Sequence, residues 1–178
     1  MTALAPIDDL ATAAIAVAAA EDEAGNLARK RVLFVCSSGG HLSQLVQLRA
    51  WWEHHERRWV TFDLPDARSK LEGEVLIPAH HPTTRNLVNL ARNAALAGSV
   101  IKEYEPDVVV SNGAGVAVPF FALANARRIP TVYVEVYDRI DSRTLTGRLC
   151  RPFTSRFLVQ WPEQQELYQE ATLIGPLY

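Results

Sequence analysis

The sequence has few of the residues that mark secreted or nucleic-acid-binding proteins. Its 178 residues include only two cysteines, Cys36 and Cys150, which is too few for a disulfide framework. The formal net charge is −2, so no overall positive field draws the chain to nucleic acid. The length suits one α/β domain with a full core and is short for two. We therefore expect a single domain in a reducing, cytoplasmic setting, with no nucleic-acid partner.

Long hydrophobic runs are also missing. The apolar stretch at residues 10–20 has eleven residues and is rich in alanine, whereas a membrane-spanning helix needs about 20. Asp8 and Asp9 precede it, where a signal peptide carries positive charge. We interpret residues 1–29 as a flexible, Ala-rich and acidic tail, and we place the domain at residues 30–178.

Short apolar runs alternate with helical patterns along the rest of the chain. Apolar residues occur at helical spacing in three separate segments: one that starts near His41, one at residues 86–104 and one at residues 118–124. This alternation predicts an α/β fold with a single Rossmann-like, doubly wound, mostly parallel sheet. The expected strands are residues 32–35, 59–62, 75–77, 106–111, 131–135, 157–160 and 171–174.

Two glycine turns each follow a buried strand, so both are expected at the carboxyl edge of the sheet, where doubly wound folds bind ligands. Free backbone N–H groups at such turns suit a phosphate or another polar group. The alternative is a tight connection that binds nothing, since neither turn matches the dinucleotide or P-loop fingerprint. The predicted binding residues are Ser38, Gly39 and Gly40 in the first turn, and Asn112, Gly113 and Gly115 in the second.

Charged side chains at the same edge supply candidates for chemistry. His41 is the first candidate for a general base, and Glu135, at the end of the fifth strand, is the second. The alternative for Glu135 is a structural cap or a salt bridge with Arg139. Arg139 and Arg148 suit a pyrophosphate, which guanidinium groups bind well. No metal is expected. The two histidines at residues 80–81 are adjacent in the chain, and side chains of neighbouring residues rarely converge on one ion.

The helix at residues 86–104 has two interpretations. It packs on the sheet, or part of its face contacts a membrane surface.

Six motifs appear in order along residues 31–178. Together they resemble the PssD-type oligosaccharide biosynthesis proteins of bacterial capsule and exopolysaccharide pathways. These are bacterial relatives of the eukaryotic subunit that recruits the second N-acetylglucosaminyltransferase of lipid-linked oligosaccharide assembly. The motifs are Cys36-Ser-Ser-Gly-Gly-His41, Ser111-Asn-Gly-Ala-Gly-Val116, Tyr133-Val-Glu135, Leu145-Thr-Gly-Arg148, Val159-Gln-Trp-Pro-Glu-Gln164 and Ile174-Gly-Pro-Leu-Tyr178.

The resemblance implies the N-terminal half of a GT-B, MurG-like glycosyltransferase. A separate PssE-type subunit would hold the nucleotide-sugar donor, such as a UDP-sugar, and this chain would bind no cofactor and be inactive alone. The complex would transfer sugar, without metal, to a lipid-pyrophosphate-linked acceptor at the inner face of the cell membrane. One rival is a non-catalytic scaffold that docks a catalytic subunit. Another is a stand-alone nucleotide-binding domain. The absence of an acidic residue that closes the second strand of this chain in a ribose-binding position argues against this rival.

The resemblance also implies where the partner docks. Single-chain relatives such as MurG have a Gly-x-Pro element where the chain crosses between domains, and here this element lies at residues 175–176. The eukaryotic subunits begin with a membrane-spanning helix that residues 1–30 do not supply. Membrane attachment is therefore expected to be peripheral, through the helix at residues 85–101 or through a partner. The expected interface residues are Gln160, Trp161, Gln164, Gly175, Pro176 and Tyr178. For Trp161, the alternative is that its side chain packs in this domain's own core.

Overall fold

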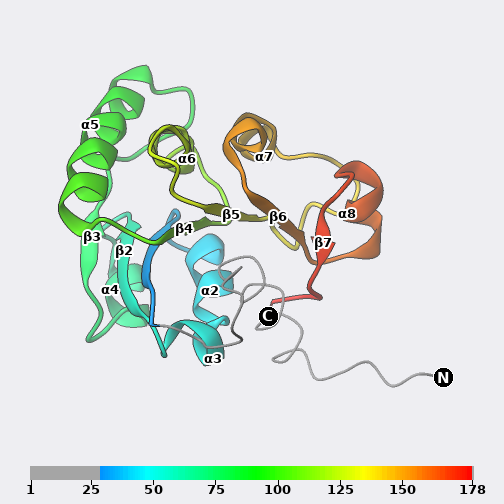
Figure 1. Ribbon diagram of the computed structural model, residues 1–178, viewed down its shortest axis with the longest axis horizontal. Helices are drawn as coiled ribbons and strands as arrows, with labels where there is room; N and C mark the ends of the chain where they lie inside the picture. Colours follow the sequence, from blue (N-terminus) through cyan, green and yellow to red (C-terminus); the bar gives the residue numbers. More distant parts are fainter. Residues whose placement is uncertain (1–28, 178) are drawn as a thin grey trace.

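In the computed structural model, which describes residues 29–177, a seven-stranded sheet crosses the centre of the molecule (Figure 1). All neighbouring strands are parallel, in the order β3-β2-β1-β4-β5-β6-β7. This is the order of a Rossmann fold extended by one strand, so the predicted fold class is confirmed. The strands are β1 (Arg31–Val35), β2 (Glu56–Thr61), β3 (Leu76–Pro78), β4 (Val108–Ser111), β5 (Thr131–Val134), β6 (Arg156–Val159) and β7 (Thr172–Leu173).

Helices cover both faces of the sheet. In Figure 1, α2 (Gly40–Val46), α3 (Arg49–Trp52) and α4 (Pro65–Lys70) lie below it. The helices above it are α5 (Leu87–Tyr104), α6 (Ala117–Ala126) and α7 (Leu145–Cys150), and a short 3₁₀ helix, η1 (Arg151–Phe153), follows α7. The last helix, α8 (Pro162–Leu167), connects β6 to β7.

The central strands are buried on both faces, which is why they are recognisable as continuous apolar runs. Successive residues of β1 alternate between two hydrophobic cores: Val32 and Phe34 pack under α2–α4, and Leu33 and Val35 pack against α5 and α6. Cys36 is fully buried, and burial raises the pKa of its thiol to about 12. A buried thiol with a raised pKa is unreactive, so Cys36 acts as a core residue.

The second strand differs from its predicted bounds of residues 59–62. β2 begins at Glu56, three residues before the apolar run, because Glu56, Arg57 and Arg58 pair with β1 through their backbone. Arg57 is accommodated by an ion pair of 2.6 Å with Glu74. The segment after β2 forms α4, which Pro65 opens at a position that tolerates proline. A helix of six residues is too short to show a clear apolar period.

Two expectations about the ends of the chain lie outside the described residues. The predicted tail at 1–29 falls there except for residue 29, and so does Tyr178. Within residues 29–177, no helix combines the length and the hydropathy that crossing a bilayer requires.

Candidate functional site

The crevice between β1 and β4 is the point where the strand order of the sheet reverses. The chain leaves β1 for α2 on one face of the sheet and leaves β4 for α6 on the other. The two connections diverge at the carboxyl ends of these strands, which is where open α/β sheets bind ligands. Both predicted glycine turns begin at this point.

Two reciprocal hydrogen bonds hold the turns together. The Nδ1 atom of His41 lies 3.0 Å from the backbone carbonyl oxygen of Asn112. In return, the side-chain Nδ2 of Asn112 donates to the carbonyl oxygen of His41 at 2.7 Å. Asn112 is fully buried. Its side chain therefore fixes the start of α2, a role that the sequence did not predict.

This geometry determines the state of the His41 imidazole. A carbonyl oxygen only accepts, so Nδ1 carries the proton and Nε2 carries the lone pair in the neutral ring. Nε2 has no hydrogen-bond partner among residues 29–177 and is not buried. Burial lowers the pKa of His41, and the contacts with Asn112 oppose this only in part. A neutral imidazole with an accessible lone pair is the form that a general base needs.

The second turn requires glycine at Gly113 and meets another loop at Gly115. Gly113 has a φ of 113°, and a Cβ atom there would lie 2.8 Å from the Tyr133 hydroxyl and 3.4 Å from His41 Cε1. At Gly115, a Cβ would lie 3.1 Å from the Cβ of Thr83. The loop that contains Thr83 thus reaches the same edge of the sheet as the turn, as expected from its place after β3.

The predicted phosphate cradle needs a correction, because the protein itself engages two of its donors. The N–H of Gly39 donates to the carboxylate of Asp66 at 2.7 Å, and the N–H of Gly113 donates to the Ser111 hydroxyl at 3.0 Å. Asp66 also places a negative charge beside the first turn, which opposes an anion there. It lies on α4, the helix that the sequence pattern did not indicate. The N–H groups of Ser38 and Gly115 have no such partner among the described residues.

Glu135 is fully buried, which argues against direct contact with a substrate. Its carboxylate accepts hydrogen bonds from the Val136 N–H at 3.0 Å, the Thr144 hydroxyl at 3.1 Å and the Tyr168 hydroxyl. Burial raises the pKa of Glu135, and these hydrogen bonds oppose the increase. The geometry favours the structural alternative, although with Thr144 and Tyr168 as partners in place of Arg139. Glu135 ties β5 to the start of α7 and the end of α8.

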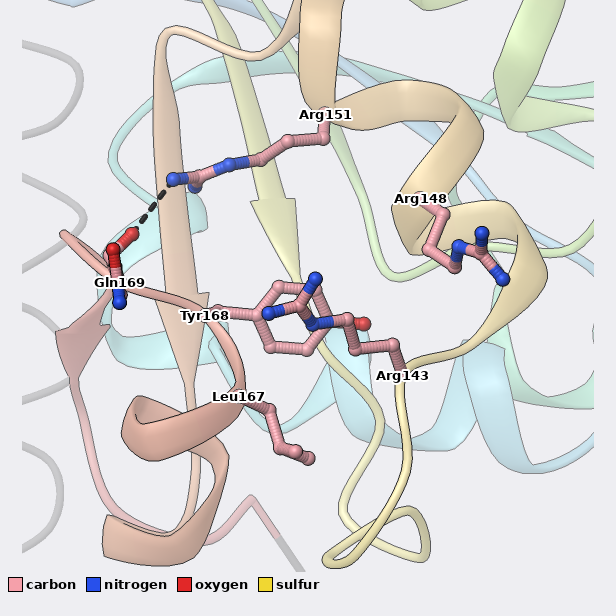
Figure 2. Close-up of a pocket in the computed structure, with 6 residues that line it drawn as sticks. All are labelled: Arg143, Arg148, Arg151, Leu167, Tyr168 and Gln169. Carbon is pink, nitrogen blue, oxygen red and sulfur yellow. Dashed lines mark hydrogen bonds between the residues drawn. The ribbon is translucent and has the colours of Figure 1, made fainter.

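The two arginines predicted for pyrophosphate lie in different places. Arg148 lines a cavity of about 420 Å³, together with residues from η1 and the end of α8 (Figure 2). Arg139 is exposed on the loop after β5 and does not line this cavity. Its backbone carbonyl accepts a hydrogen bond of 3.1 Å from Gln164.

Gln160 and Gln164 are internal, so their prediction as partner-contact residues is wrong for this chain. Both are buried. The Gln160 amide donates to Gln44 on α2 and to the Glu135 carbonyl, each at 2.8 Å. Gln164 donates to the Val136 carbonyl at 2.8 Å. These amides form a network that joins α2, the β5 loop and α8, and no pattern in the sequence distinguished it from a polar surface.

Trp161 stands at the surface beside this network. It is half-buried, and its indole N–H donates to the Tyr137 carbonyl at 2.7 Å. The Tyr137 side chain is 43% exposed. Gly175 and Pro176 are also half-buried. Packing of Trp161 wholly within the core is therefore excluded, and its indole is held in a fixed orientation with one part open to solvent.

Comparison with known proteins identifies the class and then the family. The fold is a Rossmann-like α/β domain. The sequence profile described as "Oligosaccharide biosynthesis protein Alg14 like" matches residues 80–177, and the chain belongs to this family.

Three relatives are each named UDP-N-acetylglucosamine transferase subunit ALG14. The Yarrowia lipolytica protein is 30% identical over 159 residues, which cover 83% of this chain and 68% of that protein. The Mus musculus protein is 29% identical over 177 residues, covering 82% of each chain. The Schizosaccharomyces pombe protein is 39% identical over 75 residues. The match to the Schizosaccharomyces pombe protein spans 39% of this chain and only 36% of that protein.

Solved structures with the same fold include MurG and a UDP-GlcNAc 2-epimerase. MurG from Acinetobacter baumannii matches with a TM-score of 0.62 at 16% identity, covering 75% of this chain and 42% of MurG. UDP-GlcNAc 2-epimerase from Neisseria meningitidis, bound to UDP-GlcNAc, matches with a TM-score of 0.64 at 12% identity, covering 80% of this chain and 45% of the epimerase. The chain thus corresponds in fold to less than half of each of these two proteins.

Proposed function

We propose that this chain is the acceptor-binding subunit of a two-component, metal-independent glycosyltransferase. The observation that carries the proposal is the family membership, because the relatives are named as subunits of a UDP-N-acetylglucosamine transferase. A PssE-type partner would hold the nucleotide sugar, such as a UDP-sugar. The acceptor would be a lipid-pyrophosphate-linked sugar of a bacterial capsule, exopolysaccharide or related pathway, so this chain would be of the PssD type.

His41 carries the chemistry in this proposal. As the acceptor hydroxyl attacks the anomeric carbon, its proton passes to Nε2 of His41, a glycosidic bond forms and the bond to the nucleotide diphosphate breaks. The Asn112 contacts hold the imidazole in the tautomer that accepts this proton. The N–H groups of Ser38 and Gly115 would bind sugar or phosphate oxygens in this proposal, and Arg139 would bind the pyrophosphate.

The test of this function is reconstitution of activity from two chains. The purified chain alone is expected to transfer no sugar, because the donor-binding half is on another subunit. Adding a PssE-type partner, a UDP-sugar and a lipid-linked acceptor should produce a glycosylated lipid, detected by mass spectrometry. Robust turnover by the isolated chain would contradict the half-enzyme proposal, and a complex that turns over no acceptor would contradict the transferase function.

The first turns of α5 support peripheral membrane contact. The helix packs on the sheet through its second half, where Ala97 and Ile101 are buried. At its start, Leu87 is 78% exposed and Val88 is 62% exposed. Exposed apolar side chains on a helix with flanking arginines fit an interfacial contact, and we place this contact at the inner face of the cell membrane.

Replacing Leu87 and Val88 together by serine should weaken binding to phospholipid vesicles by about a hundredfold or more, because each leucine or valine contributes about 1.5–3 kcal/mol when buried. Co-flotation with vesicles measures the effect. Val75→Ser is the matched control, since Val75 is 54% exposed but lies outside α5. If the double variant floats with vesicles as well as the unchanged chain does, the membrane contact lies elsewhere.

Trp161 is the residue proposed to anchor the partner subunit. Large amphipathic side chains are enriched at interface hot spots, and Trp161 is already oriented by its bond to Tyr137. Trp161→Ala should weaken binding of the PssE-type partner at least about tenfold, or 1.4 kcal/mol, as measured by calorimetric titration. Glu163→Ala, an exposed position on the adjacent helix, should bind normally. If Trp161→Ala binds the partner as tightly as Glu163→Ala and the unchanged chain do, the interface lies elsewhere.

A further inference from the structure

Three arginine side chains line the cavity of about 420 Å³ that lies between α7, η1 and the end of α8. None of its lining residues belongs to the two glycine turns or to α2, so the cavity is distinct from the His41 crevice. Figure 2 shows the side chain of Arg143 across the ring of Tyr168, with Arg151 reaching Gln169 on one side and Arg148 on the other. The lining residues are Arg143, Arg148, Arg151, Leu167, Tyr168 and Gln169.

The positive charge of this cavity is poorly neutralised. Within the described part of the chain, Arg143 and Arg148 form no ion pair. Arg151 lies 3.9 Å from Glu170, whose side chain is 91% exposed, and an exposed pair of this kind contributes little. No acidic side chain lines the cavity, and the nearest buried carboxylate, Glu135, is satisfied by its own hydrogen bonds.

Two of the guanidinium groups are held in place mainly by contacts other than a carboxylate. The Arg143 guanidinium carbon lies 5.6 Å from the centre of the Tyr168 ring, and Tyr168 is in turn anchored by its hydroxyl to Glu135. Arg151 donates to the Gln169 carbonyl at 2.7 Å. Because these contacts use ring faces and a carbonyl, they orient the guanidinium groups and leave their charge available, which reduces the cost of binding an anion.

We propose that this cavity binds a phosphate-bearing ligand. Guanidinium groups match the oxygens of phosphate with two parallel hydrogen bonds. The volume is within the range of small-ligand pockets and much larger than one phosphate needs, so there is room for the sugar or glycerol that carries the phosphate, against Leu167 and the ring of Tyr168. The ligand is either a soluble phosphate compound or the headgroup of an anionic phospholipid.

Binding to the full chain, without a partner subunit, tests this proposal in two arms. The first titrates inorganic pyrophosphate by calorimetry. The second measures flotation with vesicles of phosphatidylcholine, with and without phosphatidylglycerol. Arg143→Gln and Arg148→Gln should each weaken binding about tenfold, as expected when a charged hydrogen-bond partner is lost. Arg49→Gln removes the same charge from α3, on the opposite face of the sheet, and should have no effect.

The two arms identify the source of the phosphate. Pyrophosphate binding that is lost in the Arg143 and Arg148 variants supports a site for soluble phosphate compounds. Binding that requires phosphatidylglycerol and is lost in the same variants supports a lipid headgroup. If the unchanged chain binds in neither arm, or if both variants bind as Arg49→Gln does, the proposal is wrong. Because no sugar transfer is measured, this failure would leave the proposed transferase function standing.

Discussion

In the reconstituted complex, His41→Ala is expected to lower kcat by roughly a hundredfold or more, the effect of removing a general base. The expectation follows from the imidazole itself: Nδ1 is bound to the Asn112 carbonyl and Nε2 is accessible. Sugar transfer to the lipid-linked acceptor at saturating donor measures kcat. Association of the two subunits, measured separately, should be unchanged.

The pH dependence of kcat/KM for the acceptor gives a second measurement of the same role, because it reports the pKa of the free base. Burial lowers the pKa of His41 below its ordinary value, which is about 6.5, so the neutral base predominates at pH 7. As the pH falls through this lowered pKa, protonation removes the lone pair and kcat/KM should fall, with its acidic limb below pH 6.5. His41→Ala should abolish this limb. His54→Gln, an exposed control, should retain both the rate and the pH profile.

Unchanged turnover by His41→Ala in an intact complex would favour the scaffold alternative. In that case the chain would only dock and position a catalytic partner, and the ordered imidazole would be a structural link between the two turns.

Gly147→Ala is expected to destabilise the fold by about 2–4 kcal/mol, because it combines overpacking with loss of buried hydrogen bonds. A Cβ atom at Gly147 would lie 2.7 Å from Glu135 Oε2, 2.8 Å from Thr144 Oγ1 and 2.9 Å from the Tyr168 hydroxyl. All three atoms belong to one buried network, so none moves without breaking a hydrogen bond. Equilibrium unfolding in urea measures the change.

Gly98→Ala is the matched control. Gly98 lies within α5, and a Cβ atom there would meet nothing within 4 Å. Alanine at an unhindered helical position should stabilise the chain, by up to about 1 kcal/mol. Equal stability of Gly147→Ala and the unchanged chain would show that the Glu135 network relaxes easily and does not hold α7 in place.

The part of the site nearest to the sheet could be predicted from the sequence, and the part made by distant segments could not. Strands buried on both faces are continuous apolar runs, so the turns that contain His41 and Gly113 could be assigned to one edge of the sheet. Asp66 could not be placed against Gly39, because the two residues lie on segments whose approach depends on how α4 packs. Glu135 was recognised as an edge residue, but its burial depends on Tyr168, 33 residues further along the chain.

The interface prediction shows the same division. Trp161, Gln160 and Gln164 form one short polar and aromatic segment, and a linear pattern does not show which of them point inward. Tertiary packing turns the two glutamines toward Gln44 and the β5 loop and leaves part of Trp161 open. In a similar way, the arginines of residues 139–148 were treated as one group, whereas the structure separates Arg139 from Arg148.

The sequence by itself determined the fold class, the mostly parallel arrangement of the strands, and the position of His41 at the sheet edge, because apolar periodicity and glycine turns are local signals. Only the tertiary structure decided which polar groups are already satisfied within the chain. Hydrogen bonds between residues far apart in sequence depend on how helices pack, and they leave no periodic trace. Such bonds engage Gly39 and Glu135 within the fold and leave Nε2 of His41 available for chemistry.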